Sequence, residues 1–294
     1  MKYAWIREHR DSFPVAVLCR ALEVSTSGYY DWLDRPPSPR AERHAQIQAS
    51  VRQLHAESHG IYGSIKIAKQ LRERPDLESA CRNTVALAMR ELGLKSRVSK
   101  AFRPTTTQSD PTKQPAPNQL AQDFTATAPN RKWVTDITYL ATAEGWIYLA
   151  VVLDLFSRKV VGWALSPSLA TELVSQALRQ AVEARQPGGR DFLHHSDRGC
   201  QYTSDAYQQT LQALGIQCSM SRTGCCYDNA AMERFFWSLK HEWTNHETFQ
   251  NLADARLSVF RYIETFYNPE RLHQTLVYLT PNQFEAEHAP ASAA

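Results

Sequence analysis

The pattern of hydrophobic and polar positions changes from helical to strand-like near residue 130. Before that point apolar residues recur every three to four positions, which is the spacing of helices that bury one face. Segments with this spacing are 15–22, 25–33, 41–57, 64–72 and 82–92. Beyond it come three short runs rich in Val, Ile, Tyr and Trp, at 133–140, 146–153 and 159–165. Tight turns separate these runs, so they predict an antiparallel meander of three strands.

The C-terminal half then alternates between helices and short strands. Helices are expected at 171–184, 204–214 and 229–243, and strands at 191–195 and 216–220. Three strands followed by alternating helix and strand predict a mixed sheet flanked by helices, which is an α/β fold. The following segment, 253–267, is helical and rich in aromatic residues.

Two groups of short helices in the first hundred residues are typical of helix-turn-helix modules. In the first group Ser25 is expected to cap the second helix, which would face the DNA major groove. In the second group the turn His59–Gly63 joins two helices, and Arg82 opens a third that Gly93 stops. Both patterns also fit a small helical bundle without DNA contact, and the periodicity leaves the two interpretations open.

Proline-rich segments mark the expected domain boundaries. Pro36, Pro37 and Pro39 indicate a linker, and residues 104–130, rich in Pro, Thr and Gln without apolar periodicity, indicate another. The expected domains are a helix-turn-helix over 1–35, a second helix-turn-helix-like DNA-binding domain over 36–103, a sheet domain over 131–245 and a helical tail over 246–294.

Charge follows the same division. Residues 1–110 hold 18 Lys and Arg against 12 Asp and Glu, whereas residues 111–294 hold 15 against 18, so the total of +3 combines a basic front with an acidic back. A basic front next to helix-turn-helix patterns predicts a DNA partner. Candidates for phosphate contact follow the last front helix, at Lys95, Arg97, Lys100 and Arg103. The acidic back is either a solvated surface or includes carboxylates gathered for a metal ion.

Composition excludes several classes of protein. Hydrophobic residues make up 43% of the chain, which is enough for a packed core and excludes wholesale disorder. The longest uncharged apolar run, Trp146–Leu153, is too short to span a bilayer, and no signal peptide opens the chain. The six cysteines have neither a disulfide nor a zinc spacing. We therefore expect a cytoplasmic protein with reduced thiols.

Three carboxylates lie where such a sheet would bring them together. Asp136 is in the middle of the first strand, Asp197 lies just past the fourth, and Glu233 is in the first turns of the late helix. Each acid alone is compatible with a structural role. Three carboxylates side by side would repel one another unless a cation neutralised them, and Mg²⁺ prefers hard oxygen ligands. Two such ions can act together on one phosphodiester.

The chain resembles the integrase-core, or DDE, transposases, and within them the OrfB product of the bacterial insertion-sequence family numbered three. The resemblance rests on ordered blocks that cover nearly the whole chain: HGIYG, RNTVALAMRELGL, WVTDITYL, VLDLFSRKVVGW, HSDRGCQY, SMSRTGCCYDNAAMERFFWSLKHE and YNPERLHQTLVYLTP. It implies a ribonuclease H-like fold with Asp136, Asp197 and Glu233 as catalytic, metal-binding acids. Cys200 stands where a Ser is more usual in that family, and Val277 where a Gly is more usual.

The resemblance also implies an activity and partners. The expected activity is cleavage of the element's ends and joining of the 3′ hydroxyl to target DNA, with Mg²⁺, or Mn²⁺ in its place, and no covalent protein–DNA intermediate. Expected partners are double-stranded DNA, further copies of this chain on paired ends, and an upstream-frame partner, OrfA. The expected place of action is the bacterial cytoplasm, at the nucleoid. No membrane association is expected.

Further residues are candidates for DNA contact. Asn229 and Lys240 share a helix face with Glu233. Arg222 lies in the loop before that helix, and Arg271 and His273 belong to the block YNPERLH, where His273 could instead orient a metal ligand. Arg82, Lys95 and Arg97 complete the set of candidates. Zinc binding by His194 and His195 with Cys200 is not expected, because adjacent strand residues face opposite ways.

Two other functions remain open from the sequence. One is a ribonuclease H-like nuclease that hydrolyses DNA without strand transfer, and the other is a non-catalytic DNA-binding regulator with an inert sheet domain. Metal-dependent cleavage would exclude the regulator, and joined products would exclude the pure nuclease.

Overall fold

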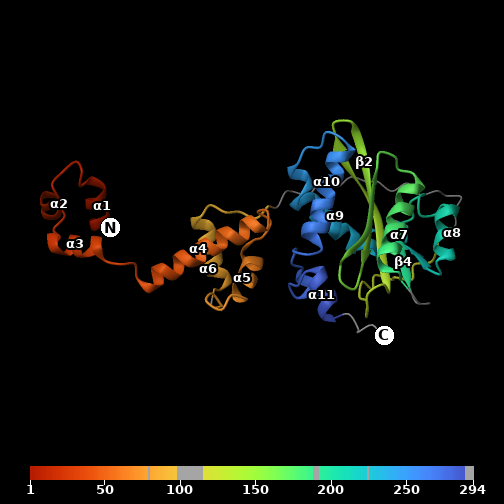
Figure 1. Ribbon diagram of the computed structural model, residues 1–294, viewed down its shortest axis with the longest axis horizontal. Helices are drawn as coiled ribbons and strands as arrows, with labels where there is room; N and C mark the ends of the chain where they lie inside the picture. The colour runs from red at the N-terminus through yellow and green to blue at the C-terminus, as the bar shows by residue number, and fades with distance from the viewer. Residues whose placement is uncertain (79, 98–114, 188–191, 224, 289–294) are drawn as a thin grey trace.

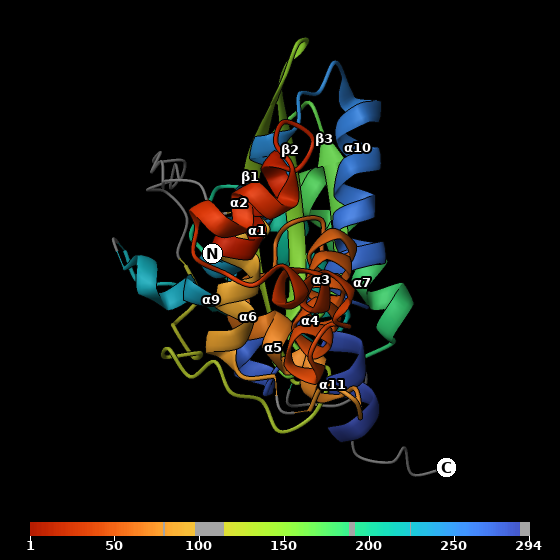
Figure 2. The same ribbon diagram turned by 90° about the vertical axis from the view of Figure 1, so that its left-hand side faces the viewer.

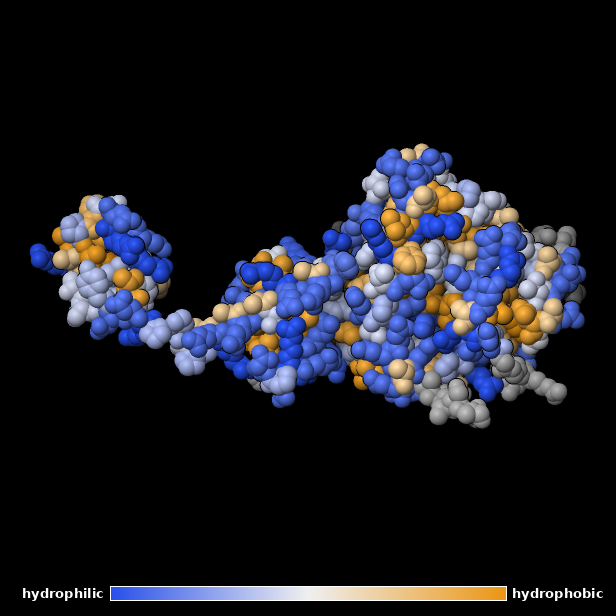
Figure 3. All heavy atoms as spheres, viewed as in Figure 1, coloured by the Kyte–Doolittle hydropathy of each residue, from blue (hydrophilic) through white to orange (hydrophobic). Residues whose placement is uncertain are grey.

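Three parts follow one another along the molecule (Figure 1). The structure is a computed structural model that describes residues 1–78, 80–97, 115–187, 192–223 and 225–288. A helical bundle at the N-terminus stands apart, a second helical bundle follows, and the sheet domain with its C-terminal helices completes the chain. Hydrophilic side chains cover most of the face seen in Figure 3, and apolar ones appear there in smaller patches. No helix among these residues has the length and apolar character needed to cross a membrane.

The N-terminal bundle consists of α1 (Lys2–His9), α2 (Val15–Ala21) and α3 (Thr26–Asp34). Its small core contains Ile6, Leu18, Cys19 and Tyr29. The Ser25 hydroxyl accepts a hydrogen bond from the Gly28 backbone N–H at 2.9 Å, so the predicted cap of α3 is confirmed. The helix α1 was not predicted, because its apolar residues are few and scattered.

The second bundle consists of α4 (Pro39–Glu57), α5 (Ser64–Arg72) and α6 (Arg82–Glu91). The assignment of Pro39 to a linker was wrong. Ser38 caps α4 by accepting from the Ala41 N–H at 3.2 Å, and Pro39 occupies the first helical position. Proline is tolerated there because its missing N–H would have no partner in any case.

This second bundle packs directly against the C-terminal part of the chain. The Tyr62 hydroxyl donates to the Glu270 carbonyl and accepts from the Leu272 N–H, both at 2.8 Å. The His59 ring meets Trp243 and Phe266 edge-on, with centroids 4.9 and 5.6 Å apart. Figure 2 shows α5 and α6 in front of the sheet domain. The bundle is therefore fixed beside the sheet domain by buried contacts.

The sheet has five strands in the order β3-β2-β1-β4-β5. Its strands are β1 (Lys132–Thr142), β2 (Gly145–Asp154), β3 (Val160–Ser166), β4 (Leu193–Ser196) and β5 (Gln217–Met220). The first three strands form an antiparallel meander, and β4 and β5 pair in parallel beside β1. The predicted α/β fold with a mixed, ribonuclease H-like sheet is confirmed, and the predicted bounds differ by a few residues at most.

Alternating strand residues bury the two faces of the sheet under different helices. Trp133 and Val152 belong to the cluster under α7 (Thr171–Arg185) and α8 (Asp205–Ala213). Val134 and Val151 belong to the cluster under α9 (Ala230–Glu242) and α10 (Leu252–Phe260). Gly162 permits the close approach of α7, because a Cβ there would lie 2.3 Å from the Ala177 carbonyl oxygen.

Part of the expected linker packs against the sheet domain. Residues 104–114, like Lys100 and Arg103, lie outside the described residues. Residues 115–130 form no helix or strand, but they pack against the sheet domain. Leu120 is 1% exposed, and the N–H groups of Gln119 and Leu120 donate to the Ser219 hydroxyl at 2.9 and 3.1 Å. This part of the linker therefore belongs to the sheet domain.

The C-terminal segment continues α10 as a π-helical turn over Arg261–Tyr267 and ends in α11 (Pro281–His288). Between them Val277 has a φ of 54°. This left-handed conformation favours glycine and costs a β-branched residue about 1–2 kcal/mol. Glycine would adopt this conformation without that strain.

We expect Val277→Gly to raise the free energy of unfolding by about 1 kcal/mol, because relief of the strain exceeds the entropy that glycine loses on folding. The side chain is 73% exposed, so its removal costs little packing. Urea denaturation would measure the change, and a loss of stability would contradict the assigned backbone conformation.

Candidate active site

Asp136 and Asp197 meet through the parallel pairing of β1 with β4. The register pairs Lys132 with Leu193 and Val134 with His195. The same offset, continued by two residues, sets Asp136 beside Asp197 where β4 has just ended. The topology thus brings together two acids that are distant in the sequence.

Backbone N–H groups orient both carboxylates. Asp136 Oδ1 accepts from the Ile137 N–H at 2.8 Å, and Asp197 Oδ1 accepts from the Gly199 N–H at 2.9 Å. A Cβ on residue 199 would lie only 3.1 Å from Asp197 Oδ1. Glycine at this position therefore lets the loop after β4 fold tightly around the Asp197 carboxylate.

The three predicted acids act on one another electrostatically. Desolvation and the Asp197 charge raise the pKa of the Asp136 carboxyl well above its ordinary value, and the Glu233 charge raises it further. The Ile137 N–H and the Lys240 ammonium lower that pKa. Asp136 is therefore held in an environment that disfavours its negative charge, and a bound cation would relieve the repulsion.

Glu233 lies on α9, which packs beside β1. A short 3₁₀ turn, Cys226–Asn229, leads into the helix, and the buried Asn229 side chain donates to the Thr135 carbonyl at 3.1 Å. Seven residues beyond Glu233, the Lys240 ammonium lies 4.4 Å from the centroid of the Tyr139 ring. Both contacts are with β1, so they hold the Glu233 face of α9 along the strand that carries Asp136.

The donor set suits a hard divalent cation, although the ligands are not gathered around one point. Within the part of the chain that the structure describes, no group of three or more His, Cys, Asp or Glu side chains could hold a metal ion as arranged. Glu233 is exposed in the first turn of α9. A site with all three acids as ligands requires the Glu233 side chain to turn toward Asp136 and Asp197.

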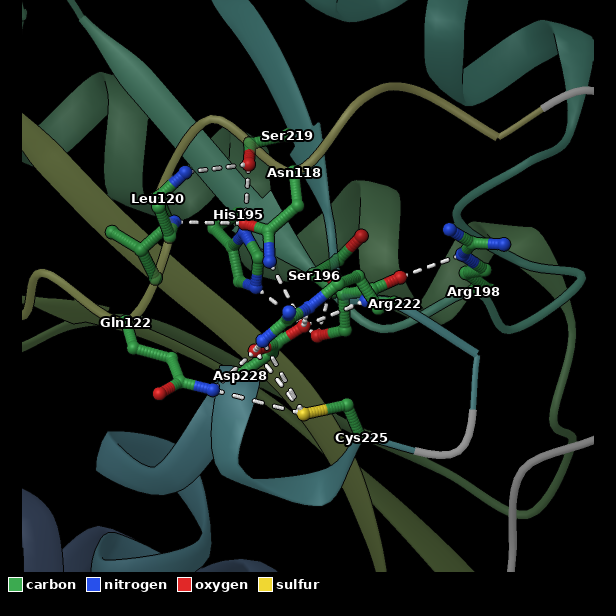
Figure 4. Close-up of polar contacts among 12 residues, drawn as sticks. Asn118, Leu120, Gln122, His195, Ser196, Arg198, Ser219, Arg222, Cys225 and Asp228 are labelled. Atoms are coloured by element: carbon green, nitrogen blue, oxygen red, sulfur yellow. Dashed lines mark hydrogen bonds and ion pairs between the residues drawn. The ribbon is translucent and has the colours of Figure 1, made fainter.

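A buried carboxylate organises the loop before α9 (Figure 4). Asp228 accepts from the Arg222 guanidinium at 2.9 and 3.0 Å and from the Arg222 N–H at 2.8 Å. The amides of Asn118 and Gln122 donate to it at 2.8 Å each. The Arg222 hydrogen bonds hold the pKa of Asp228 well below its ordinary value. Asp228 thus ties residues 118–122 to the loop that positions α9.

The two histidines before Asp197 have separate partners. His194 Nε2 lies 2.8 Å from the Tyr207 hydroxyl, whereas His195 contacts the hydroxyls of Ser219 and Ser221 at 2.8 and 3.1 Å. Burial lowers the pKa of His194 to about 3 and that of His195 to about 4. Both rings are neutral packing elements that face different neighbours, as the strand alternation predicts.

The structure does not bring all of the predicted DNA-binding residues to the acids. Arg222 is engaged with Asp228, and Asn229 is buried. Arg271 is 5% exposed and pairs with Glu242 at 2.5 Å, next to His273, which is also buried. The predicted DNA-binding residues of the second bundle, Arg82, Lys95 and Arg97, have exposed side chains.

Sequence reasoning missed Asn118, Gln122 and Glu242. Each is an ordinary polar residue in the sequence, and its partner lies far away along the chain. No local pattern marks these residues, so only the tertiary structure identifies them as supports of the site.

Comparisons with known proteins define the class. An integrase core domain model matches residues 126–226, a second integrase core domain model matches 214–281, and an HTH-like domain model matches 41–102. The chain is therefore an integrase-core protein with an HTH-like domain. Simian T-cell lymphotropic virus intasome, in complex with PP2A regulatory subunit B56 gamma, contains a chain that matches 83% of this one, with 17% identity and a TM-score of 0.47.

Curated relatives define the family more closely. The chain is 40% identical over 289 residues to transposase InsF for insertion sequence IS3A of Escherichia coli, covering 97% of this chain and 98% of the relative. It is 36% identical to the insertion element IS600 uncharacterized 31 kDa protein of Shigella sonnei, covering 94% and 100%. The chain belongs to the family of IS3 transposases, and the resemblance found in the sequence is confirmed.

Proposed function

We propose that this chain cleaves the ends of its insertion sequence and joins the exposed 3′ hydroxyl to target DNA, with Asp136, Asp197 and Glu233 as the catalytic acids. The main support is the β1–β4 register, which sets Asp136 beside Asp197. The electrostatic influence of Asp197 and Glu233 on Asp136 also supports it. The relatives named as transposases add the substrate class.

The acids are proposed to hold Mg²⁺, for which Mn²⁺ can substitute. Two such ions, when bound, activate the attacking oxygen and stabilise the leaving oxygen of a phosphodiester. The backbone N–H groups of Ile137 and Gly199 orient the carboxylates of Asp136 and Asp197, and Glu233 lies in the first turn of α9. Water and then the DNA 3′ hydroxyl are the nucleophiles, so the protein needs no nucleophilic side chain.

Replacing Asp136 by Asn tests the metal site without DNA. Removal of the charge relieves repulsion with Asp197, so the variant in EDTA is expected to have a higher Tm than the wild type. Mg²⁺ is expected to raise the Tm of the wild type by mass action and to leave that of Asp136→Asn unchanged. Thermal unfolding with and without Mg²⁺ measures both effects, and an equal Mg²⁺ response in the two proteins would refute the assignment.

Lys240 is proposed to bind a phosphate of the element end. Burial lowers its pKa, and the neighbouring Asp136 charge opposes that effect. Lys240→Ala is expected to weaken end binding and to reduce the slope of log K against log salt by about 0.9 for each phosphate that the lysine neutralises. Fluorescence anisotropy at several salt concentrations would measure this, and an unchanged slope would show that Lys240 binds no phosphate.

The helical parts are proposed to read the DNA. The HTH-like match and the exposed Arg82, Lys95 and Arg97 support this role for the second domain, over residues 36–103. In the N-terminal bundle, residues 1–35, four residues separate α2 from α3, a turn length typical of the same motif. Two ends must be joined together, so assembly of several copies and association with an upstream-frame partner, OrfA, belong to the same proposal.

A Mg²⁺-dependent cleavage product from the purified chain would exclude the alternative function, a non-catalytic DNA-binding regulator with an inert sheet domain.

A further inference from the structure

A basic cleft lies between the second helical bundle and the sheet domain. It has a volume of about 890 Å³ and is bounded by the start of α5, one face of α9 and the segment from Tyr267 to Tyr278. Two of its walls are therefore the proposed DNA-reading domain and the helix that carries Glu233. The roles proposed for the three catalytic acids do not account for this cleft.

Cations dominate the walls of the cleft. The basic residues that line it are Lys66, Arg97, Arg158, Arg234 and Arg271, and Glu242 is the one acid among the described lining residues. Glu242 is already paired with Arg271 at 2.5 Å. The other four cations have no further acid among the described lining residues, so the cleft is complementary to an anion.

Lys66 shows how crowded these cations are. Its ammonium lies 4.7 Å from the centroid of the Tyr62 ring, and desolvation together with the Arg271 charge lowers its pKa to about 7. Arg234 adds to the effect, and Glu242 opposes it. A phosphate bound beside Lys66 would favour its protonated form.

The cleft also has surfaces on which bases can stack. The Arg234 guanidinium lies 4.5 Å from the centroid of the Trp237 ring, which also stacks on the His241 ring with centroids 4.6 Å apart. The surfaces left for a base are therefore the Arg234 guanidinium and the half-buried Tyr278, which also lines the cleft. Unpaired bases stack on aromatic rings and on guanidinium planes. A basic groove with such surfaces is typical of sites that bind single strands.

Size and position favour a single strand over a duplex. Clefts of this volume hold small ligands, so this one has room for a few unpaired nucleotides. Arg234 follows Glu233 directly, so it lies about 100° further around α9. A strand leaving the catalytic acids can therefore pass over Arg234 into the cleft.

We propose that this cleft binds a few unpaired nucleotides of the DNA strand next to the cut, with Lys66 and Arg234 on phosphates and Arg234 and Tyr278 against bases. This inference rests on the proposed function, since it takes the strand from the same active site. The element end would be frayed there, and the cleft would hold the separated strand away from its complement.

Binding of a fluorescein-labelled oligodeoxythymidine tests the cleft without any chemistry. Lys66→Gln and Arg234→Gln are each expected to weaken binding about tenfold. The matched control is Arg72→Gln, an exposed cation of α5 that does not line the cleft. Circular dichroism and thermal unfolding of each variant show whether it is folded. Removing the Lys66 charge relieves repulsion, so that variant should not unfold.

A pH series adds a readout that a structural role would not change. The charged and titratable groups around Lys66 are Tyr62 before α5, Arg234 and Glu242 on α9, and Arg271 and His273 in the C-terminal segment. Wild-type affinity for the oligonucleotide should fall as pH rises above about 7, because phosphate binding then requires Lys66 to take up a proton. Lys66→Gln should lose this dependence.

Three results would overturn the inference. The wild type does not bind the single strand, both variants bind it as tightly as the wild type does, or the variants lose only their binding of duplex DNA. The last result would make the cleft a duplex-binding surface. Any of these results, together with strand transfer by the wild type, would reject the cleft and leave the proposed function intact. If the variants weaken binding of the single strand but the wild type cleaves no DNA, the proposed function would be rejected and the role of the cleft would stand.

Discussion

Replacing Glu233 by Gln is expected to lower the rates of DNA cleavage and of strand joining by about a thousandfold or more. The substitution keeps the shape of the side chain but removes the charge that a divalent ion needs, and metal ions supply several kcal/mol of transition-state stabilisation. Binding of the element end should persist, because it depends mainly on the cations of the helical domains.

A labelled element-end duplex in Mg²⁺ measures the effect. Glu183→Gln is a matched control, since Glu183 is an exposed acid of α7 on the opposite face of the sheet from α9. The control should retain wild-type rates. Joining that survives in Glu233→Gln would remove Glu233 from the catalytic acids, whatever the role of the sheet carboxylates.

Replacing Arg271 by Ala is expected to lower the free energy of unfolding by about 3–5 kcal/mol, because it leaves the buried Glu242 carboxylate without its partner. The Arg271 guanidinium donates to both Glu242 oxygens at 2.5 and 2.6 Å and to the Ser238 hydroxyl at 3.1 Å. These contacts fasten the C-terminal segment to α9, so the variant should also loosen the helix that carries Glu233.

Urea denaturation of Arg271→Ala measures this decrease in stability. Arg179→Ala is a matched control, because Arg179 bridges Glu172 with side chains that are 50% and 61% exposed. Such surface pairs contribute about 0–1 kcal/mol. A decrease at Arg271 as small as at Arg179 would restore Arg271 as a candidate for direct DNA contact.

Much of the fold was accessible from the sequence because local patterns agree with the tertiary structure. The Val- and Ile-rich runs form the meander, and Ser25 caps α3 as its spacing predicts. Asp136 and Asp197 were placed together because strand order in an α/β sheet limits where a mid-strand acid and a strand-end acid can lie. The helical periodicity after Asn229 predicts that Glu233 lies near the start of its helix, and the structure has it in the first turn of α9.

The remainder depends on contacts between distant parts of the chain. Residues 115–130 resemble a linker in composition, yet the hydroxyl of Ser219 and the carboxylate of Asp228 bind them. Arg271 resembles a surface cation, yet its partner Glu242 lies 29 residues earlier on α9. Local periodicity carries no information about such partners, because each bond forms only after the separate elements have packed.

A strand-transfer assay with the purified chain is the sharpest test of the proposed activity. A labelled element end, already cut to expose its 3′ hydroxyl, is incubated with target DNA in Mg²⁺, and the products are sequenced. We predict a labelled strand covalently joined to the target, formed only when Mg²⁺ or Mn²⁺ is present. Hydrolysis of DNA in Mg²⁺ without any joined product, under conditions in which the chain binds the end, would contradict this activity.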